Sequence, residues 1–394
     1  MNRFKYYFVL LLAGLAIVSC NKKDDDEIEV TPIRDYKVQY EADKDSIEKF
    51  LKTNYIENVT ADFEAKISKI PAGGTQTSIW DQQTYKLQSR EVYSNDVKYK
   101  VYYLVLREGT GESPTNTDRV SVAYSCYLMN NTLADSSYGN PFTANLFPFA
   151  SGNTVIQGWS EIMPKFRTGD NPTTSNDGVI TYDNYGAGVM FLPSGLAYYA
   201  SPSGVIPAYS CIYFNIKLFA LQRMDNEYNV TSAGISIVGD GVPDYLEDIN
   251  GDGYLYDLRN TTRYPNPPDY MLGDDSDKDG IPDYLDFDDD GDGYTTRLEV
   301  TKPTDQIGWG KLNGENFYYG ISKYYPYNAP VPDNPATPNV DESEPWGIPR
   351  RPTGVLKDPS KPESKTNPRA FVPEDYTTPD RLRIHLDKTY PYPF

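Results

Sequence analysis

The 394-residue chain has little histidine, little cysteine and no excess of positive charge. A single histidine, His385, excludes a zinc site built on several histidines. The formal net charge of −19 argues against binding to nucleic acid or to an anionic surface. Long apolar runs are also scarce, because the one near the N-terminus, residues 6–18, is too short for a comfortable membrane span.

That N-terminal run has the features of a secretory signal. Asn2, Arg3 and Lys5 form a short basic region before it, and the run ends in "IVSC". A small residue directly before Cys20 resembles a bacterial lipoprotein signal, in which this cysteine becomes the lipidated first residue. The following "NKKDDDE" resembles the export signal of Bacteroidota surface lipoproteins. We therefore expect an outer-membrane lipoprotein that faces the cell exterior, anchored by acyl chains on Cys20.

Two cysteines, Cys126 and Cys211, remain after lipidation. An oxidising envelope would allow them to pair, and each lies in a separate strand-like stretch. The sequence leaves two interpretations open, a disulfide and two buried free thiols.

Composition divides the chain into seven segments. We expect a signal peptide, a lipidated acidic tether, a helical or extended segment, a folded domain, a linker, an acidic module and an extended Pro- and Tyr-rich region. Their boundaries are 1–19, 20–34, 35–94, 95–223, 224–238, 239–300 and 301–394. Sixteen of the 31 prolines lie in the last segment, which predicts extended chain without a core of its own. Such a chain is either disordered or wraps over the other domains or a partner, and its aromatic residues favour docking: Tyr318, Tyr319, Tyr324, Tyr325, Trp346, Phe371, Tyr390 and Phe394.

The folded domain alternates like a β protein. "VKYKVYYLVLREG" (97–109), "RVSVAYSCYL" (119–128), "GAGVMFLP" (186–193) and "SCIYFNIKLFAL" (210–221) are strand-like, and one helix-like stretch, "WSEIMPKF", interrupts them. Upstream, residues 43–53 predict a short helix capped by Asp43 or Asp45. The pattern predicts an α+β domain with a mostly antiparallel sheet and a short helix.

This domain resembles an FKBP-type peptidyl-prolyl cis-trans isomerase. The resemblance rests on "NTVIQGWSEIMPKFRTGD" (153–170) and "FLPSGLAYYASPSGVIPAYSCIYFNIKL" (191–218), with "VAYSCYL" and "ADSSYGNPF" in the right order upstream. It covers about 125 residues. It implies a strongly bent antiparallel sheet around a short helix, with an aromatic pocket between them.

The resemblance also implies the pocket residues. Trp159 would form the floor, the Ile156 backbone N–H and the Tyr198 hydroxyl would donate to substrate carbonyls, and Asp135 would be the single acid. The walls would be Tyr124, Phe142, Val155, Ile156 and Phe214, with Ile206 on an overhanging loop. The sequence departs from the family at Ala134, where an aromatic residue usually precedes the acid, and at "AYY" in place of A-Y-G.

The acidic module contains an internal repeat. "DGVPDYLEDINGDGY" (240–254) recurs as "DGIPDYLDFDDDGDGY" (279–294), and residues 240–299 hold 18 acidic against four basic residues. A solvated acidic linker would not repeat Pro, Tyr and Leu in register.

The second copy has the spacing of an EF-hand-type calcium loop. Acids stand at loop positions 1, 3, 5 and 12, Gly293 stands at the sharp turn, and the Tyr294 carbonyl is suited to position 7. The preceding acids resemble thrombospondin type 3 calcium repeats. The predicted ligands are Asp275, Asp277, Asp279, Asp283, Asp286, Asp288, Asp290, Asp292, Tyr294 and Glu299.

The first copy is degenerate, with Arg259 at position 12. Its predicted ligands are Asp240, Asp244, Glu247, Asp248, Asn250 and Asp252. We expect two or more structural calcium ions and no organic cofactor.

The sequence therefore predicts an isomerase or chaperone at the outer membrane that acts on proline-containing client polypeptides, within an outer-membrane protein complex for insertion or secretion. Ala134 leaves open the rival that the fold is catalytically weak and serves as a structural or binding subunit. A third alternative is a glycan-binding surface lipoprotein.

Overall fold

The computed structural model describes residues 32–148, 154–232, 234–312, 314–320, 322–325, 347–378 and 381–390. The predicted signal peptide, Cys20 and most of the predicted tether lie outside these ranges. From Asp35 onward the described residues form one compact unit. No helix within the described ranges is long and apolar enough to cross a membrane.

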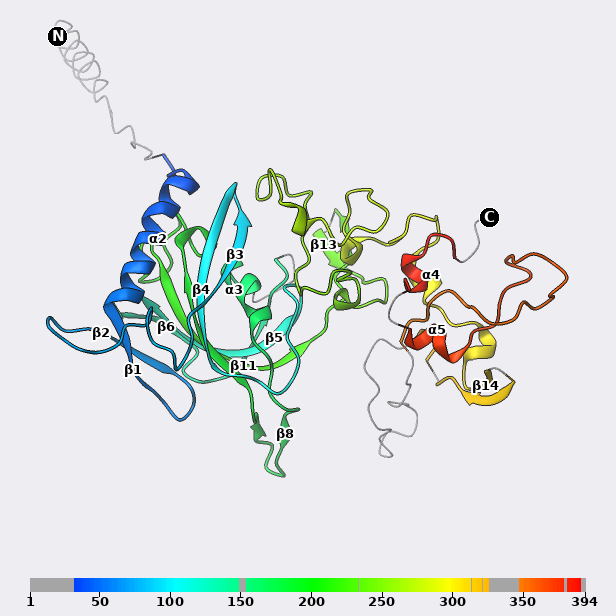
Figure 1. The fold of residues 1–394 in the computed structure, drawn as a ribbon, viewed down its shortest axis with the longest axis horizontal. Coiled ribbons are helices and arrows are strands. Elements are labelled where there is room, and N and C mark those ends of the chain that lie inside the picture. Colours follow the sequence, from blue (N-terminus) through cyan, green and yellow to red (C-terminus); the bar gives the residue numbers. More distant parts are fainter. Residues whose placement is uncertain are drawn as a thin grey trace, which may run out of the picture. The chain divides into compact units, whose positions relative to one another are not determined.

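An antiparallel sheet of seven strands organises the first half of the chain (Figure 1). The strand order is β3-β4-β10-β11-β5-β6, and β7 pairs with β5. The bounds are β3 Gln88–Ser94, β4 Val97–Arg107, β5 Arg119–Leu128, β6 Leu133–Ser136, β7 Phe142–Asn145, β10 Gly186–Leu192 and β11 Ile212–Gln222. The sheet thus begins at Gln88, before the predicted domain boundary at residue 95, because β3 forms a hairpin with β4.

Helices pack on both faces of this sheet. On one face lie α3 (Gln157–Ile162) and the 3₁₀ turn η1 (Met163–Lys165), with Trp159 and Ile162 in the core. On the other lies α2 (Tyr36–Thr53), which buries Ile47, Phe50 and Leu51 against β4, β10 and β11. Every residue of β10 is buried, which explains its uninterrupted apolar run.

Helix α2 is longer than predicted. It begins at Tyr36, because the Asp35 side chain caps the backbone N–H groups of Lys37 and Val38. Asp43 is therefore not a cap. Its buried carboxylate accepts hydrogen bonds from the Ser194 backbone N–H (2.8 Å) and hydroxyl (2.6 Å), which ties the helix to the turn after β10.

Short elements complete the domain and the linker. They are β1 (Asn54–Val59) with β2 (Ala65–Lys69), β8 (Thr173–Thr174) with β9 (Ile180–Thr181), the turn η2 (Ser194–Leu196), and β12 (Tyr228–Thr231) with β13 (Gly234–Ile237). Cys126 and Cys211 are both buried free thiols, which decides between the two interpretations left open by the sequence.

The acidic module is built from turns. It contains η3 (Asp244–Leu246), η4 (Asp269–Met271), η5 (Asp283–Leu285) and the one-turn helix α4 (Thr296–Glu299). Its small apolar clusters include residues of the preceding domain, because Tyr93 packs with Tyr254 and Tyr256, and Phe147 packs with Leu255 and Tyr284.

The described part of residues 301–394 packs against the acidic module, which is the alternative that its aromatic residues favoured. Leu312, Tyr325, Ile348, Phe371 and Ile384 pack together around Val242 and Val300 of the acidic module. The elements are η6 (Thr304–Gln306), β14 (Trp309–Leu312), β15 (Glu315–Tyr318), α5 (Pro373–Thr377) and η7 (Ile384–Leu386). Aromatic side chains from distant positions supply the core that proline-rich composition argued against.

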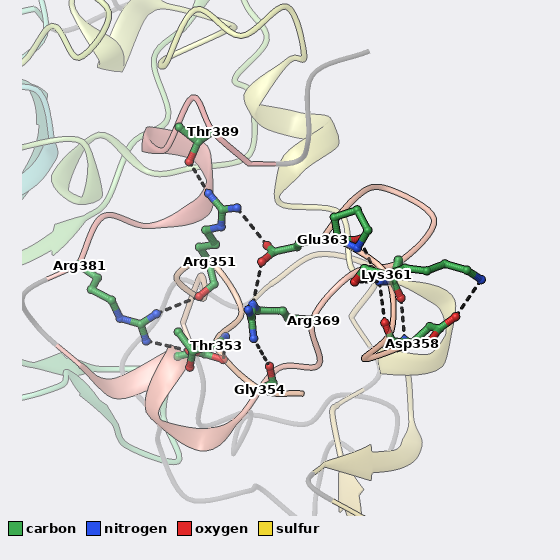
Figure 2. Close-up of polar contacts among 12 residues, drawn as sticks. Arg351, Thr353, Gly354, Asp358, Lys361, Glu363, Arg369, Arg381 and Thr389 are labelled. Atoms are coloured by element: carbon green, nitrogen blue, oxygen red, sulfur yellow. Dashed lines mark hydrogen bonds and ion pairs between the residues drawn. The ribbon is translucent and has the colours of Figure 1, made fainter. Parts of the chain in front are cut away.

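Ion pairs fix this C-terminal region (Figure 2). The Glu363 carboxylate accepts from Arg351 Nη2 (3.0 Å) and from Arg369 Nε (2.7 Å), so it holds two chain segments together. Arg381 donates to the Arg351 carbonyl oxygen (2.9 Å) and to Asp375 (2.8 Å). The hydrogen-bond acceptors that these guanidinium groups contact are side chains and carbonyl oxygens of the same chain.

Candidate functional site

A cavity of about 250 Å³ opens between α3 and the sheet. Of the nine residues predicted for the pocket, eight line it: Tyr124, Asp135, Phe142, Val155, Ile156, Trp159, Tyr198 and Phe214. Ile206 does not. It is buried in the core, on a turn in which its backbone exchanges two hydrogen bonds with that of Ser203.

Aromatic rings form the floor and the walls. The Trp159 ring centre lies 5.4 Å from Tyr124 and 5.3 Å from Phe214, and both pairs are nearly perpendicular at 87°. The Phe142 ring centre lies 5.5 Å from that of Tyr124 and 6.4 Å from that of Trp159. Edge-to-face rings of this kind hold one another in fixed orientations, so the cavity is preformed.

The start of α3 places the floor. Trp159 directly follows Gly158, where a Cβ atom would lie 2.6 Å from Leu192 Cδ1. A side chain at this position would have to displace the buried Leu192 side chain, so glycine suits the close approach of the helix to β10. Residue Ile156 caps the helix with extended backbone angles, and none of the hydrogen bonds among the described residues uses its N–H. That donor is available to a ligand carbonyl.

One hydrogen bond joins the aromatic wall to the acid at the rim. The Tyr124 hydroxyl donates to Asp135 Oδ2 at 2.6 Å, and the Ser136 backbone N–H donates to Asp135 Oδ1 at 2.8 Å. Asp135 is otherwise exposed. Burial, together with the neighbouring Asp135 carboxylate, raises the pKa of Tyr124 well above its ordinary value, so the phenol stays a donor.

Two lining residues escaped the prediction, Cys126 and Thr154. Cys126 lies two residues after Tyr124 on β5, and alternation along a strand places both on one face. The two-residue alternation along the strand is therefore the sequence signal that could have identified Cys126 as a lining residue. Burial raises the pKa of the Cys126 thiol to about 12, so the sulfur stays protonated and packs as a small apolar group.

The acidic module supports the helix that carries Trp159. Glu161 is buried and accepts from Arg90 Nη2 (2.9 Å) and from the Tyr256 hydroxyl (3.1 Å). The Tyr254 hydroxyl donates to the Glu161 carbonyl oxygen at 3.0 Å. Arg90 also stacks on the Tyr254 ring, 3.2 Å from its centre. The module therefore contacts α3 directly behind the pocket.

Many of the predicted calcium ligands lie in loops that share one hydrogen-bond pattern. In the loops that begin at Asp248, Asp275 and Asp288, the first aspartate accepts the backbone N–H of the glycine five residues later. Carboxylate oxygens of Asp275, Asp277 and Asp279 lie within 4.8 Å of one another, as do those of Asp288, Asp290 and Asp292. The internal repeat is thus a structural repeat.

Glu299 points toward the second of these groups. Both of its carboxylate oxygens are buried without a hydrogen-bond partner. Burial, and then Asp290, Asp292 and Asp288, raise the pKa of Glu299 to about 10. Glu299 is therefore a buried carboxylate close enough to Asp288, Asp290 and Asp292 to feel their charge.

Other predicted ligands have different partners. The Asp244 carboxylate accepts from the Asn226 backbone N–H and Nδ2, and the Asp283 carboxylate from the Ser276 backbone N–H and hydroxyl. Asp286 Oδ1 accepts from two backbone N–H groups of its own turn. Asn250 and Asp252 accept backbone N–H groups of the first loop. Asp240 and Glu247 instead meet Asp289, which the prediction omitted.

Comparison with known proteins identifies the class of the first domain. Residues 110–219 match the family described as FKBP-type peptidyl-prolyl cis-trans isomerase, and residues 239–339 match the family described as BamM C-terminal. The chain therefore contains an FKBP-type isomerase domain with an antiparallel sheet and few helices, as the sequence motifs predicted.

Individual relatives are similar over this domain. The chain is 42% identical over 78 residues to the peptidyl-prolyl cis-trans isomerase Mip of Coxiella burnetii, which covers 19% of this chain and 30% of that protein. It is 35% identical over 129 residues to the FKBP-type isomerase FkpA of Aeromonas hydrophila, covering 31% and 38%. It is 28% identical over 120 residues to FK506-binding protein 1 of Dictyostelium discoideum, covering 30% and 94%. The chain spans about a third of the length of the first two relatives.

Proposed function

We propose that the chain is a peptidyl-prolyl cis-trans isomerase that acts on proline-containing polypeptides. The carrying observation is the preformed aromatic cavity, with Trp159 as its floor and the unused Ile156 N–H at its edge. A prolyl ring fits an apolar cavity of this kind. Ile156 and Tyr198 both line the cavity, and we propose that the Ile156 N–H and the Tyr198 hydroxyl donate to the flanking carbonyl groups.

Prolyl isomerisation requires a pocket that excludes water, and it involves no covalent step. Rotation about a peptide bond meets a barrier of about 18–20 kcal/mol, because amide resonance is lost. A twisted amide is less dipolar than a planar one. A desolvated aromatic site therefore disfavours the planar ground state more than the twisted transition state, which lowers the barrier.

The rival function is client or partner binding without catalysis. Ala134, partly buried against the core next to Asp135, replaces the aromatic residue usual in the family and leaves less apolar wall around the substrate. A proline-peptide isomerisation assay on the full-length chain separates the two. We expect acceleration above the uncatalysed rate and its loss on addition of FK506, the ligand in the name of the Dictyostelium relative. An unaccelerated rate with retained peptide binding selects the rival.

We also propose that Cys20 carries lipid and holds the protein at the outer membrane, facing outward. The signal-like run, "IVSC" and the acidic residues after Cys20 support this. Radioactive palmitate should label the wild-type chain and not Cys20→Ser, and externally added protease should cleave the protein on intact cells. We propose in addition that it joins an outer-membrane protein complex, which the match of residues 239–339 to BamM C-terminal supports.

We propose further that the acidic module binds structural calcium. The grouped carboxylates of the Asp275 and Asp288 loops, with Glu299 beside the latter, suit a hard cation that takes six to eight oxygen ligands. When bound, calcium would neutralise this charge and stiffen turns that have little apolar core.

A further inference from the structure

Four buried carboxylates converge outside the grouped repeat loops. Asp240, Glu247 and Asp289 offer oxygens that lie within 4.8 Å of one another, and Glu227 forms a second such group with Asp240 and Asp225. Glu227 comes just before β12, Asp240 and Glu247 flank η3, and Asp289 belongs to the second repeat copy. The cluster thus joins three separate segments of the chain.

These side chains are withdrawn from water. The exposed fraction is 0% for Glu227, Asp240 and Glu247, and 1% for Asp289. Six of their eight carboxylate oxygens have no hydrogen-bond partner: Glu227 Oε1, Asp240 Oδ2, both of Glu247 and both of Asp289. A buried carboxylate without partners is rare in folded proteins and costs several kcal/mol, so this arrangement calls for a positive charge.

The described residues do not supply that charge. Arg297 is the neighbouring cation, and its Nη1 donates to the Asp240 carbonyl oxygen at 3.2 Å instead of to a carboxylate. None of the ion pairs among the described residues includes any of the four carboxylates. Burial raises the pKa of Glu247 well above its ordinary value, and the negative charges of Glu227, Asp240 and Asp289 raise it further.

Backbone contacts hold the cluster in place. The Asp225 carboxylate accepts from the backbone N–H groups of Asp240 and Gly241, both at 3.0 Å. Glu227 Oε2 accepts from the Asp240 N–H at 3.0 Å, which leaves Oε1 for the cluster. Asp225 therefore positions Asp240, through which the group with Glu227 adjoins the group with Glu247 and Asp289.

We propose that Glu227, Asp240, Glu247 and Asp289 together bind a hard divalent cation, calcium, that clamps the segment after β11 to both repeat copies. The donor set is all oxygen, which disfavours zinc. Six anionic oxygens without waters suit calcium, whereas magnesium usually keeps several waters. The site differs from the repeat loops in its ligands, because Glu227 lies outside the repeat and Asp289 stands between the alternating ligands of its loop.

Calcium titration of the full-length chain, purified in detergent and stripped with chelator, tests the clamp. Glu247→Gln should bind one calcium equivalent fewer than wild type. The matched control is Asp257→Asn, which removes a charge from the same module. Asp257 pairs with Arg259 and is not part of the cluster. This control should keep the wild-type stoichiometry, and Asp288→Asn reports separately on the repeat loop.

Thermal unfolding gives a second readout with opposite signs. In chelator, Glu247→Gln should unfold at a higher temperature than wild type, because it removes a buried unpaired charge. In calcium it should unfold at a lower temperature, because the ligand is lost. If Glu247→Gln does not fold, Glu227→Gln at the edge of the cluster carries the same prediction.

Unchanged calcium stoichiometry in these variants, or an equal shift of unfolding temperature in calcium and in chelator, would overturn the clamp. If only Asp288→Asn loses a calcium equivalent, the repeat loop binds calcium and the cluster of Glu227, Asp240, Glu247 and Asp289 does not. The isomerase proposal is tested by the proline-peptide isomerisation assay and does not depend on the calcium measurements.

Discussion

The Tyr124 hydroxyl lies 2.6 Å from Asp135 Oδ2, so the wall of the aromatic cavity and the acid at its rim are joined by one charge-assisted hydrogen bond. The two side chains come from paired strands, β5 and β6. The bond fixes the Tyr124 ring against Trp159 and Phe214, and the pocket thereby keeps its shape.

We predict that Tyr124→Phe and Asp135→Asn each lower kcat/KM for a proline peptide. A hydrogen bond to a charged group contributes about 1.5–3 kcal/mol, which corresponds to a loss of roughly tenfold or more. Because both changes break the same bond, the double variant should lose little more than either single variant. Fully additive losses would show that the two groups act separately.

The buried ion pair between Arg90 of β3 and Glu161 of α3 should stabilise the isomerase domain. Arg90→Met leaves the Glu161 carboxylate, whose side chain is 3% exposed, without its cation. Removing one partner of a buried ion pair costs about 3–5 kcal/mol. We expect a loss of that size in urea unfolding and partial recovery when Glu161→Gln is added. Equal stability of Arg90→Met and wild type would show that the pair is not needed.

Acid should destabilise the C-terminal region through His385. Burial, and then Arg383, lower the pKa of His385 to about 3, whereas the ordinary value is about 6.5. The unfolded chain therefore takes up a proton between these values and the folded chain does not, so stability is present above pH 6.5 and is lost as the pH falls. The difference is about 2 kcal/mol between pH 6.5 and 5. His385→Leu should remove this part of the pH dependence, measured by urea unfolding at several pH values. A parallel pH dependence in both proteins would contradict the assignment.

Calcium should stabilise the second repeat loop through Glu299. At about 100 times its Kd, one ion bound only to the folded state adds about 2.7 kcal/mol. Glu299→Gln should lose this gain, and Glu315→Gln, an exposed residue of β15, should keep it. The unfolding temperature with calcium and with chelator measures the effect. Equal temperatures for wild type in both conditions would remove calcium from this loop.

The sequence predicted the aromatic pocket well, because its residues come from short motifs with fixed spacing. It missed Cys126 as a lining residue although the strand period contained it. It placed Ile206 over the cavity, whereas the turn at Ser203 directs it into the core. Helix α2 was predicted too short because Gln39 and Asp43, both buried, interrupt its apolar pattern.

Features assembled from distant segments could not be predicted. The sequence predicted Asp240 and Glu247 as metal ligands but not their neighbours Glu227 and Asp289. Those two depend on how the linker and the two repeat copies fold against each other, and no spacing encodes that. The C-terminal core has the same origin, because Phe371 and Ile384 pack on Val242 and Val300 without any local periodicity. Composition alone therefore predicted an extended arm there.

The most direct test of the isomerase proposal is the rate of proline-peptide isomerisation with full-length Trp159→Ala. Removing the buried floor should reduce kcat/KM by at least about tenfold, because an apolar pocket of this kind desolvates the amide. The control is Trp309→Ala, which changes a 76% exposed tryptophan far along the chain and should keep the wild-type rate. Thermal unfolding of both variants checks that they are folded. We predict that wild type accelerates isomerisation, that Trp309→Ala keeps this acceleration and that Trp159→Ala loses it. A wild-type rate equal to the uncatalysed rate, or equal activity in a folded Trp159→Ala, would contradict it.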